Sequence, residues 1–211
     1  METNHAHNHH SHRRDCGVAA QDLIDKSGYA AAALTLIPLP GSEIVAVMPI
    51  HVGMVVGVGA IYGQSVTKKA ATDMVVQICT TVGMSLVGSR IATTAAKVLL
   101  PGLGGFVAAP FMFASTLAIG AVARAYFESG CSMSDAEMRS VYERAQRSAR
   151  SSFDASRMRS EEARDAAEAA ATQDVAEDPS ERLEKLRRLL DDGLIDQSEY
   201  DETKARVLSE L

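Results

Sequence analysis

The sequence predicts an all-α protein made of hydrophobic helical hairpins, a charged amphipathic helix and a small C-terminal helical hairpin. Apolar residues make up 46% of its 211 residues, yet only 5% are aromatic and tryptophan is absent, so aliphatic helix-forming residues dominate. Residues 29–128 carry eight charged side chains, whereas the last 83 residues carry 33. This split is expected between a part in lipid or a deep core and a solvated part.

Charge and cysteine content exclude several classes of protein. The net charge is −6 and no basic face stands out, so we expect no nucleic-acid partner. The three cysteines are odd in number and lack CxxC spacing, which indicates a reducing cytoplasmic setting rather than a disulfide framework. The N-terminus does not have the pattern of a cleaved signal peptide.

The composition divides the chain into four segments. They are a disordered His-rich tail at residues 1–17, a hydrophobic helical domain at 18–130, a charged amphipathic helix and linker at 131–177, and a helical hairpin at 178–211.

The tail has a candidate for metal binding in its closely spaced imidazoles, which suit zinc, nickel or copper. The alternative is a polar tail that binds metal loosely. The candidate ligands are His5, His7, His9, His10 and His12.

The hydrophobic domain predicts four helices separated by proline and glycine turns. The first begins at Val18 and ends before Pro38, and the second spans Glu43–Tyr62 with an uncharged run, Ile44–Ile61, that is long enough to cross a bilayer. Gly53 and Gly57 are four residues apart, so they favour close helix packing in a membrane. A soluble helix weakened by glycine is the alternative.

The third predicted helix runs from about Ser65 to Leu100, and the fourth contains the uncharged run Phe106–Ala123, in which Pro110 should cause at most a kink. Polar residues within the domain allow a proton or ion path. The alternative is that they pair, face the bundle interior or lie near the headgroups. These residues are Glu43, His51, Asp73 and Arg90.

The charged part carries strong helix-start signals. Ser134 and Glu137 have capping-box spacing before an amphipathic helix, and the segment that follows, to Ala176, is either a solvated helix or a flexible spacer. Asp178-Pro179 opens the final hairpin and Gly193 is suited to its turn. The hairpin has more apolar residues than so small a unit can hide, so it predicts self-association through Leu183, Leu186, Leu190, Ile195, Tyr200, Val207 and Leu208.

Two sets of motifs resemble known domains. Leu36-Ile-Pro-Leu-Pro-Gly-Ser-Glu43, the apolar stretch Ile44–Met54, Ile61-Tyr-Gly63 and the Pro101-Gly-Leu-Gly-Gly105 turn make residues 29–128 similar to the YcjF-like bacterial domain of unknown function. Leu183-x-x-Leu186, Asp192-Gly-Leu-Ile195 and Glu199-Tyr200 before Lys204 make residues 180–211 similar to the short C-terminal SHOCT domain.

The first resemblance implies a bacterial membrane module that serves a partner GTPase, and the second implies oligomerisation. Neither brings catalytic residues, and we expect neither an enzyme nor a cofactor. The turn Gly102-Leu-Gly-Gly105 lacks the following Lys-Ser/Thr of a phosphate-binding loop, so nucleotide binding by this chain is not expected.

Our leading hypothesis is therefore a non-enzymatic scaffold or adaptor of the cytoplasmic membrane that forms homo-oligomers. It should resist extraction by alkaline carbonate, with both termini cytoplasmic by the positive-inside rule. One alternative is a soluble or peripheral helical oligomer that buries its apolar helices against copies of itself. Another is a small channel or transporter component.

Overall fold

The structure is a computed structural model that describes residues 3–37, 43–83, 104–176 and 178–209; for residues 3–14, 43–46, 104–107 and 173–176 it describes the backbone alone. All regular structure in these ranges is helical, which confirms the predicted all-α class. The helices are α1 (Thr3–Leu34), α2 (Glu43–Ile61), α3 (Lys68–Gly83), α5 (Gly104–Glu128), α6 (Asp135–Ser152), α7 (Ala155–Met158), α8 (Glu161–Ala176), α9 (Pro179–Asp191) and α10 (Gln197–Ser209).

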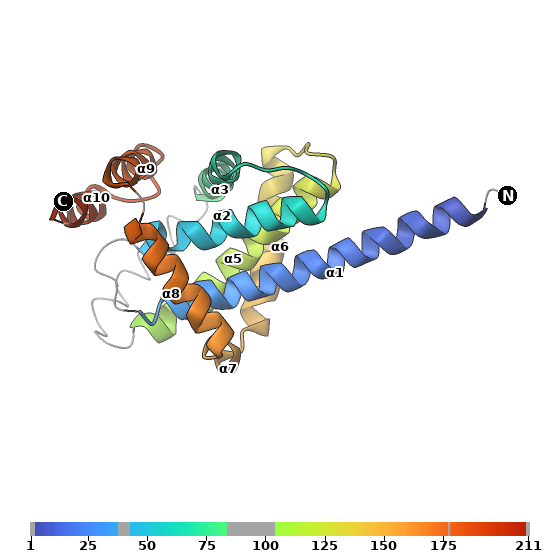
Figure 1. Cartoon of the computed structure of the whole chain (residues 1–211), viewed down its shortest axis with the longest axis horizontal. Coiled ribbons are helices and arrows are strands. Elements are labelled where there is room, and N and C mark those ends of the chain that lie inside the picture. The colour runs from blue at the N-terminus through green and yellow to red at the C-terminus, as the bar shows by residue number, and fades with distance from the viewer. Residues whose placement is uncertain (1–2, 38–42, 84–103, 177, 210–211) are drawn as a thin grey trace.

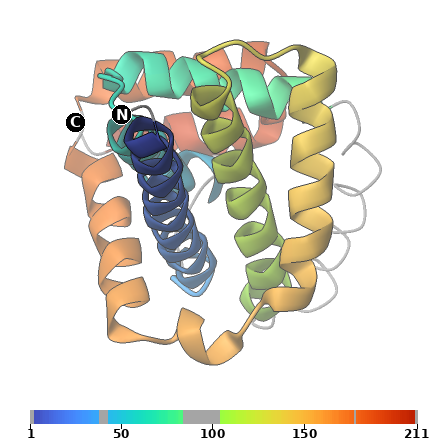
Figure 2. The same ribbon diagram turned by 90° about the vertical axis from the view of Figure 1, so that its right-hand side faces the viewer.

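Helices α1, α2 and α5 pack together at the centre of a bundle (Figure 1). Figure 2 shows α1 and α5 side by side, framed by α3, α6, α7 and α8. Helices α2 and α5 are apolar on nearly every side, so neighbours must cover them in water. The core accordingly contains fully buried side chains from all three helices: Ile24, Met54, Val58 and Val122.

The charged segment belongs to this bundle. Helix α6 packs along α5 through Met138, Tyr142 and Ala149, and exposes its polar face. For the segment that ends at Ala176, the sequence left open a solvated helix or a flexible spacer. It forms helix α8, which packs on α1 and α2 through buried alanines such as Ala167. Small side chains gave a weak periodic signal, so this packing face was not evident from the sequence.

Aromatic residues hold the turn between α6 and α8 against the core. The ring of Phe113 on α5 lies 4.6 Å from the ring of Tyr29 on α1 and 5.5 Å from that of Phe153. Met158, at the end of α7, is 1% exposed. These contacts determine where α8 begins and which of its faces meets α1 and α2.

The capping signals in the sequence are confirmed. Ser134 and Glu137 form a reciprocal capping box at the start of α6. The carboxylate of Asp178 accepts a hydrogen bond from the backbone N–H of Ser180, directly after Pro179. At the hairpin turn, Gly193 has a φ of +67°, which glycine adopts without steric strain.

The N-terminal segment, which the sequence predicts to be disordered, has a helical backbone. Helix α1 begins at Thr3, so the His-rich residues have a helical backbone, and Figure 1 shows this end of α1 projecting away from the bundle. Neither proline nor glycine occurs before Gly17, and a helix already nucleated in the core extends at little cost per residue. Composition alone does not reveal this connection to a buried helix.

Parts of two further predictions lie outside the described residues. The third helix, expected from Ser65 to Leu100, is described as α3 up to Gly83, and residues 84–103 lie outside the description. The turn at residues 38–42 also lies outside it. Helix α5 continues through Pro110, as expected for a proline in the first turns of a helix.

One helix within the described ranges is long and apolar enough to cross a membrane, by length and composition. It is the part of α5 from Ala108 to Glu128, and 56% of its apolar window is buried inside the protein. The shorter apolar helix Val47–Ile61 lies beside it in the bundle. In the described ranges the exposed large apolar side chains are Val18, Leu36 and Leu208, so the described parts of α2 and α5 have no exposed large apolar side chain.

Candidate functional site

The two glycines that the sequence selected for helix packing have different surroundings. A Cβ at Gly57 would lie 2.6 Å from Cδ2 of Leu23, so the absence of a side chain there lets α2 approach α1. A Cβ at Gly53 would meet nothing within 4 Å. Gly57 therefore packs within the chain, whereas Gly53 borders an open hollow beside α8.

Two glycines that the sequence analysis did not select for packing also lie at close helix contacts. A Cβ at Gly28 would overlap Cδ1 of Leu117, and one at Gly120 would lie 2.7 Å from both Cγ atoms of Ile24. Both positions are at the crossing of α1 and α5. Their signal in the sequence was weak, because Gly120 stands alone among alanines without a second glycine four residues away.

The histidines proposed as metal ligands, His5, His7, His9, His10 and His12, have side chains that lie outside the description. Among the side chains that the structure does describe, no group of three or more histidines, cysteines and carboxylates is placed to hold a metal ion. Metal binding by the tail therefore remains a prediction from the sequence.

Of the four polar residues of the hydrophobic region, the two whose side chains the structure describes, His51 and Asp73, have different partners. The Nε2 atom of His51 lies 3.0 Å from the hydroxyl of Thr116, and both side chains are buried between α2 and α5. Asp73 is on α3 and pairs with Arg188 of α9 at 2.8 Å. Arg90 and the side chain of Glu43 lie outside the description.

Burial lowers the pKa of His51 from 6.5 to about 4, because the charged imidazolium loses its hydration there. As the pH falls, the unfolded chain takes up the proton first. We therefore expect the free energy of unfolding to fall by about 3 kcal/mol between roughly pH 6.5 and pH 4. Chemical unfolding followed by circular dichroism measures this loss.

His51→Asn is the control, because its amide can still bond Thr116 but does not titrate. Its stability should be nearly independent of pH until the carboxylates with lowered pKa values, such as Glu137 and Asp154, are protonated. Equal pH dependence in both proteins would contradict the role of His51.

The residues selected for oligomerisation gather in the hairpin formed by α9 and α10, but they differ in exposure. Leu186, Ile195 and Val207 are 1–2% exposed and form the inside of the hairpin, together with Leu189, which the sequence analysis had not selected for this role. Leu208 is 47% exposed. Of the remaining members, Tyr200 is buried, and Leu183 and Leu190 are half-buried.

The fold and its sites define an all-α protein in two parts, a helical bundle with an apolar centre and a short C-terminal helical hairpin. The chain belongs to the family of the domain of unknown function DUF697, whose family model matches residues 9–151. Residues 181–208 match the short C-terminal domain SHOCT. These matches confirm the two resemblances seen in the sequence. No curated protein and no solved structure matches the chain.

Proposed function

We propose that this protein is a non-enzymatic bacterial scaffold that self-associates through its C-terminal hairpin, acts at the cytoplasmic membrane and serves a partner GTPase. One observation carries the proposal: the small hairpin of α9 and α10 leaves the large apolar side chain of Leu208 at 47% exposure. Two helices of 13 residues each bury little apolar surface, so a second copy would supply the missing burial.

The surroundings of His51 support a role without catalysis. A histidine that acts as a general base needs access to substrate and commonly a carboxylate to orient it. His51 is 5% exposed, and its hydrogen-bond partner is the hydroxyl of Thr116. The GTPase partner rests on the family resemblance, and a tagged chain should co-purify with that GTPase from its own cells.

Removal of the hairpin tests self-association. A chain that ends at Ala176 keeps the helices of the bundle and lacks α9 and α10. We expect light scattering to show fewer subunits in each assembly of this shortened chain than in each assembly of the full chain. If both chains have the same subunit number, assembly resides in the bundle and the hairpin has another role.

The packing of charged helices favours peripheral contact with the membrane over a spanning topology. Helix α6 lies along α5 and exposes Arg144, Arg147 and Arg150. If α5 crossed the bilayer in this fold, these arginines would enter the hydrocarbon at roughly 2.5–3.5 kcal/mol each. A bundle that stays closed at the membrane surface avoids this cost, so the geometry supports the peripheral alternative of the sequence analysis.

Extraction of isolated membranes separates the two topologies. We expect the protein to float with vesicles at low salt and to be released by alkaline carbonate, because its apolar helices remain covered by α6 and α8. Retention after carbonate, with α5 protected from added protease, would instead favour a spanning helix and an opened bundle. Complete absence from the membrane fraction would contradict both forms of membrane association.

A further inference from the structure

The outer side of α6 has a row of arginines that the sequence analysis had not identified as a basic face. Arg144, Arg147 and Arg150 are exposed and lie three residues apart, so this arginine row extends over about 9 Å of helix. The row is on the side of α6 opposite the face that packs on α5, which contains Tyr142 and Ala149. The function proposed above gives these arginines no binding role.

The region around the row is positively charged, although the chain as a whole is negative. Residues 139–159, which span most of α6 and all of α7, contain six arginines and two carboxylates. The rest of the chain contains 15 basic and 25 acidic side chains. Helix α5, on which α6 packs, has no charged residue from Gly104 to Ala123, so it does not offset the charge of the row. This region is therefore a basic face on an acidic protein.

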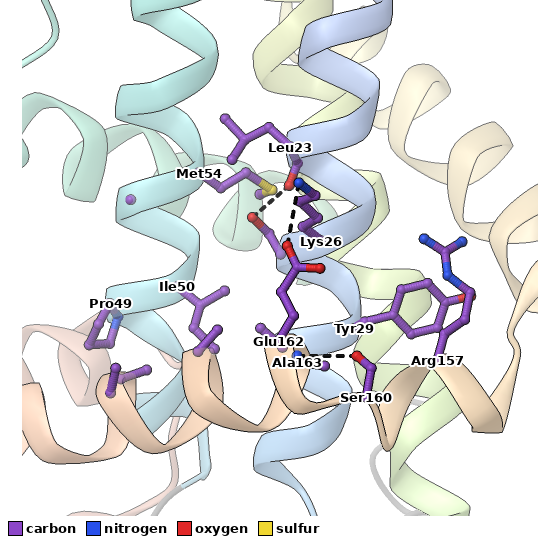
Figure 3. A pocket seen from close by; sticks show the side chains of 16 residues that line it. Leu23, Lys26, Tyr29, Pro49, Ile50, Met54, Arg157, Ser160, Glu162 and Ala163 are labelled. Carbon is purple, nitrogen blue, oxygen red and sulfur yellow. Dashed lines mark hydrogen bonds and ion pairs between the residues drawn. The ribbon is translucent and has the colours of Figure 1, made fainter.

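The two carboxylates of this region do not neutralise the row. Glu143 lies 3.7 Å from Arg147, but both side chains are about half exposed or more, and such surface pairs contribute little. Asp154 interacts with Arg157, which is not part of the row. The guanidinium of Arg157 also lies 4.4 Å from the centre of the Tyr29 ring, as Figure 3 shows. The row therefore keeps an excess of positive charge.

The other side of the bundle has the reverse charge. Figure 2 shows α6 in yellow and α8 in orange on either side of the pair formed by α1 and α5. Helix α8 exposes Glu161, Asp165 and Glu168 and has one basic residue, Arg164. An anionic surface would therefore attract the α6 side and repel the α8 side, which selects one orientation of the bundle.

We propose that the arginine row is the surface through which the bundle binds an anionic lipid bilayer, an inference that rests on the peripheral membrane contact proposed above. Arginine forms bidentate hydrogen bonds with phosphate, so the row is suited to lipid headgroups. A nucleic acid is a poorer match, because three arginines on one helix reach few phosphates. The aromatic residue of α6, Tyr142, is buried and cannot stack on a base.

Co-sedimentation of the full chain with vesicles tests this proposal. At low salt we expect binding to vesicles of equal parts phosphatidylcholine and phosphatidylglycerol, and little binding to phosphatidylcholine alone. Each arginine near an anionic bilayer contributes roughly fivefold in affinity, so Arg144→Gln, Arg147→Gln and Arg150→Gln together should weaken binding roughly 100-fold. Added salt should release the wild-type chain, because it screens exposed charges.

Two further triple variants are the controls. Lys68→Gln, Lys69→Gln and Arg164→Gln together change the net charge by the same amount, but these exposed residues are on α3 and α8, so binding should weaken by no more than about twofold. Lysine at all three positions of the row keeps the charge and loses the bidentate geometry, so binding should stay within roughly fivefold of the wild type. Circular dichroism verifies that each variant is folded.

Failure of this proposal can be told from failure of the proposed function. If the glutamine variant of the row binds the mixed vesicles as tightly as the wild type, the bundle meets the membrane through another surface, and peripheral association itself stands. If the wild-type chain binds neither kind of vesicle, both the role of the row and the membrane part of the proposed function are wrong. Equal weakening in the two glutamine variants would mean that net charge, and not this face, attracts the protein. Tighter binding of a labelled single-stranded RNA than of the mixed vesicles, lost in the glutamine variant of the row, would assign the row to nucleic acid.

Discussion

Gly120→Val is expected to lower the free energy of unfolding by about 3 kcal/mol, the upper part of the usual range for overpacking in a core. The added Cβ would lie 2.7 Å from Cγ1 and Cγ2 of Ile24 and 3.0 Å from the sulfur of Met54. Both neighbours are about 1% exposed, so neither can turn into solvent. The crossing of α1 and α5 must therefore widen, which also disturbs the packing of α2.

The measurement is thermal unfolding followed by circular dichroism. For a chain of this length, about 3 kcal/mol corresponds to a decrease in melting temperature of roughly 6–12 °C. Gly53→Val is the matched control, because it places the same side chain in a central helix where a Cβ meets nothing within 4 Å. Equal melting temperatures for the two variants would mean that α1 and α5 do not cross at Gly120.

Leu186→Asp and Leu208→Asp are expected to act on the hairpin in different ways. Leu186 is 1% exposed, so a carboxylate there would be buried without a partner, and we expect α9 and α10 to lose their helical structure. A core leucine contributes roughly 2–5 kcal/mol, more than a hairpin of this size has in reserve. Leu208 is 47% exposed, so Leu208→Asp should leave the hairpin folded and reduce self-association.

Limited proteolysis reports the folding of the hairpin, and light scattering reports the subunit number. Ala205→Asp, at an exposed position on α10, is the control for an added charge on the surface. If Leu208→Asp and Ala205→Asp assemble equally well, the exposed face around Leu208 is not the contact surface. Rapid cleavage of Leu208→Asp between α9 and α10 would mean that Leu208 supports the fold of the hairpin itself.

Local features of this protein could be predicted from short stretches of sequence. The cap at Ser134, the start at Asp178-Pro179 and the turn at Gly193 each depend on residues within about four positions of one another. The buried face of α6 follows from the spacing of Met138 and Tyr142. The all-α class and both family resemblances depend on the same kind of local information.

Candidate contacts between helices could not be chosen reliably in the same way. The sequence analysis selected Gly53 and Gly57 because they are four residues apart, yet a Cβ at Gly53 would meet nothing within 4 Å, whereas Gly28 and Gly120, which were not selected, lie at close contacts between α1 and α5. Spacing along one helix says that a small-residue face exists, but it does not say which helix lies against it. The hollow beside α8 was missed for the same reason, since its lining comes from three separate helices.

The sequence by itself therefore determined the all-α class, the caps at Ser134 and Asp178, the apolar runs of α2 and α5 and the C-terminal hairpin. The tertiary structure decided what covers those runs, because an uncharged helix can be surrounded equally by lipid or by other helices. Here α6 covers α5 and the alanines of α8 cover α1 and α2. The hydrophobic effect is non-directional, so the packing of the whole chain decides which helix covers each apolar surface.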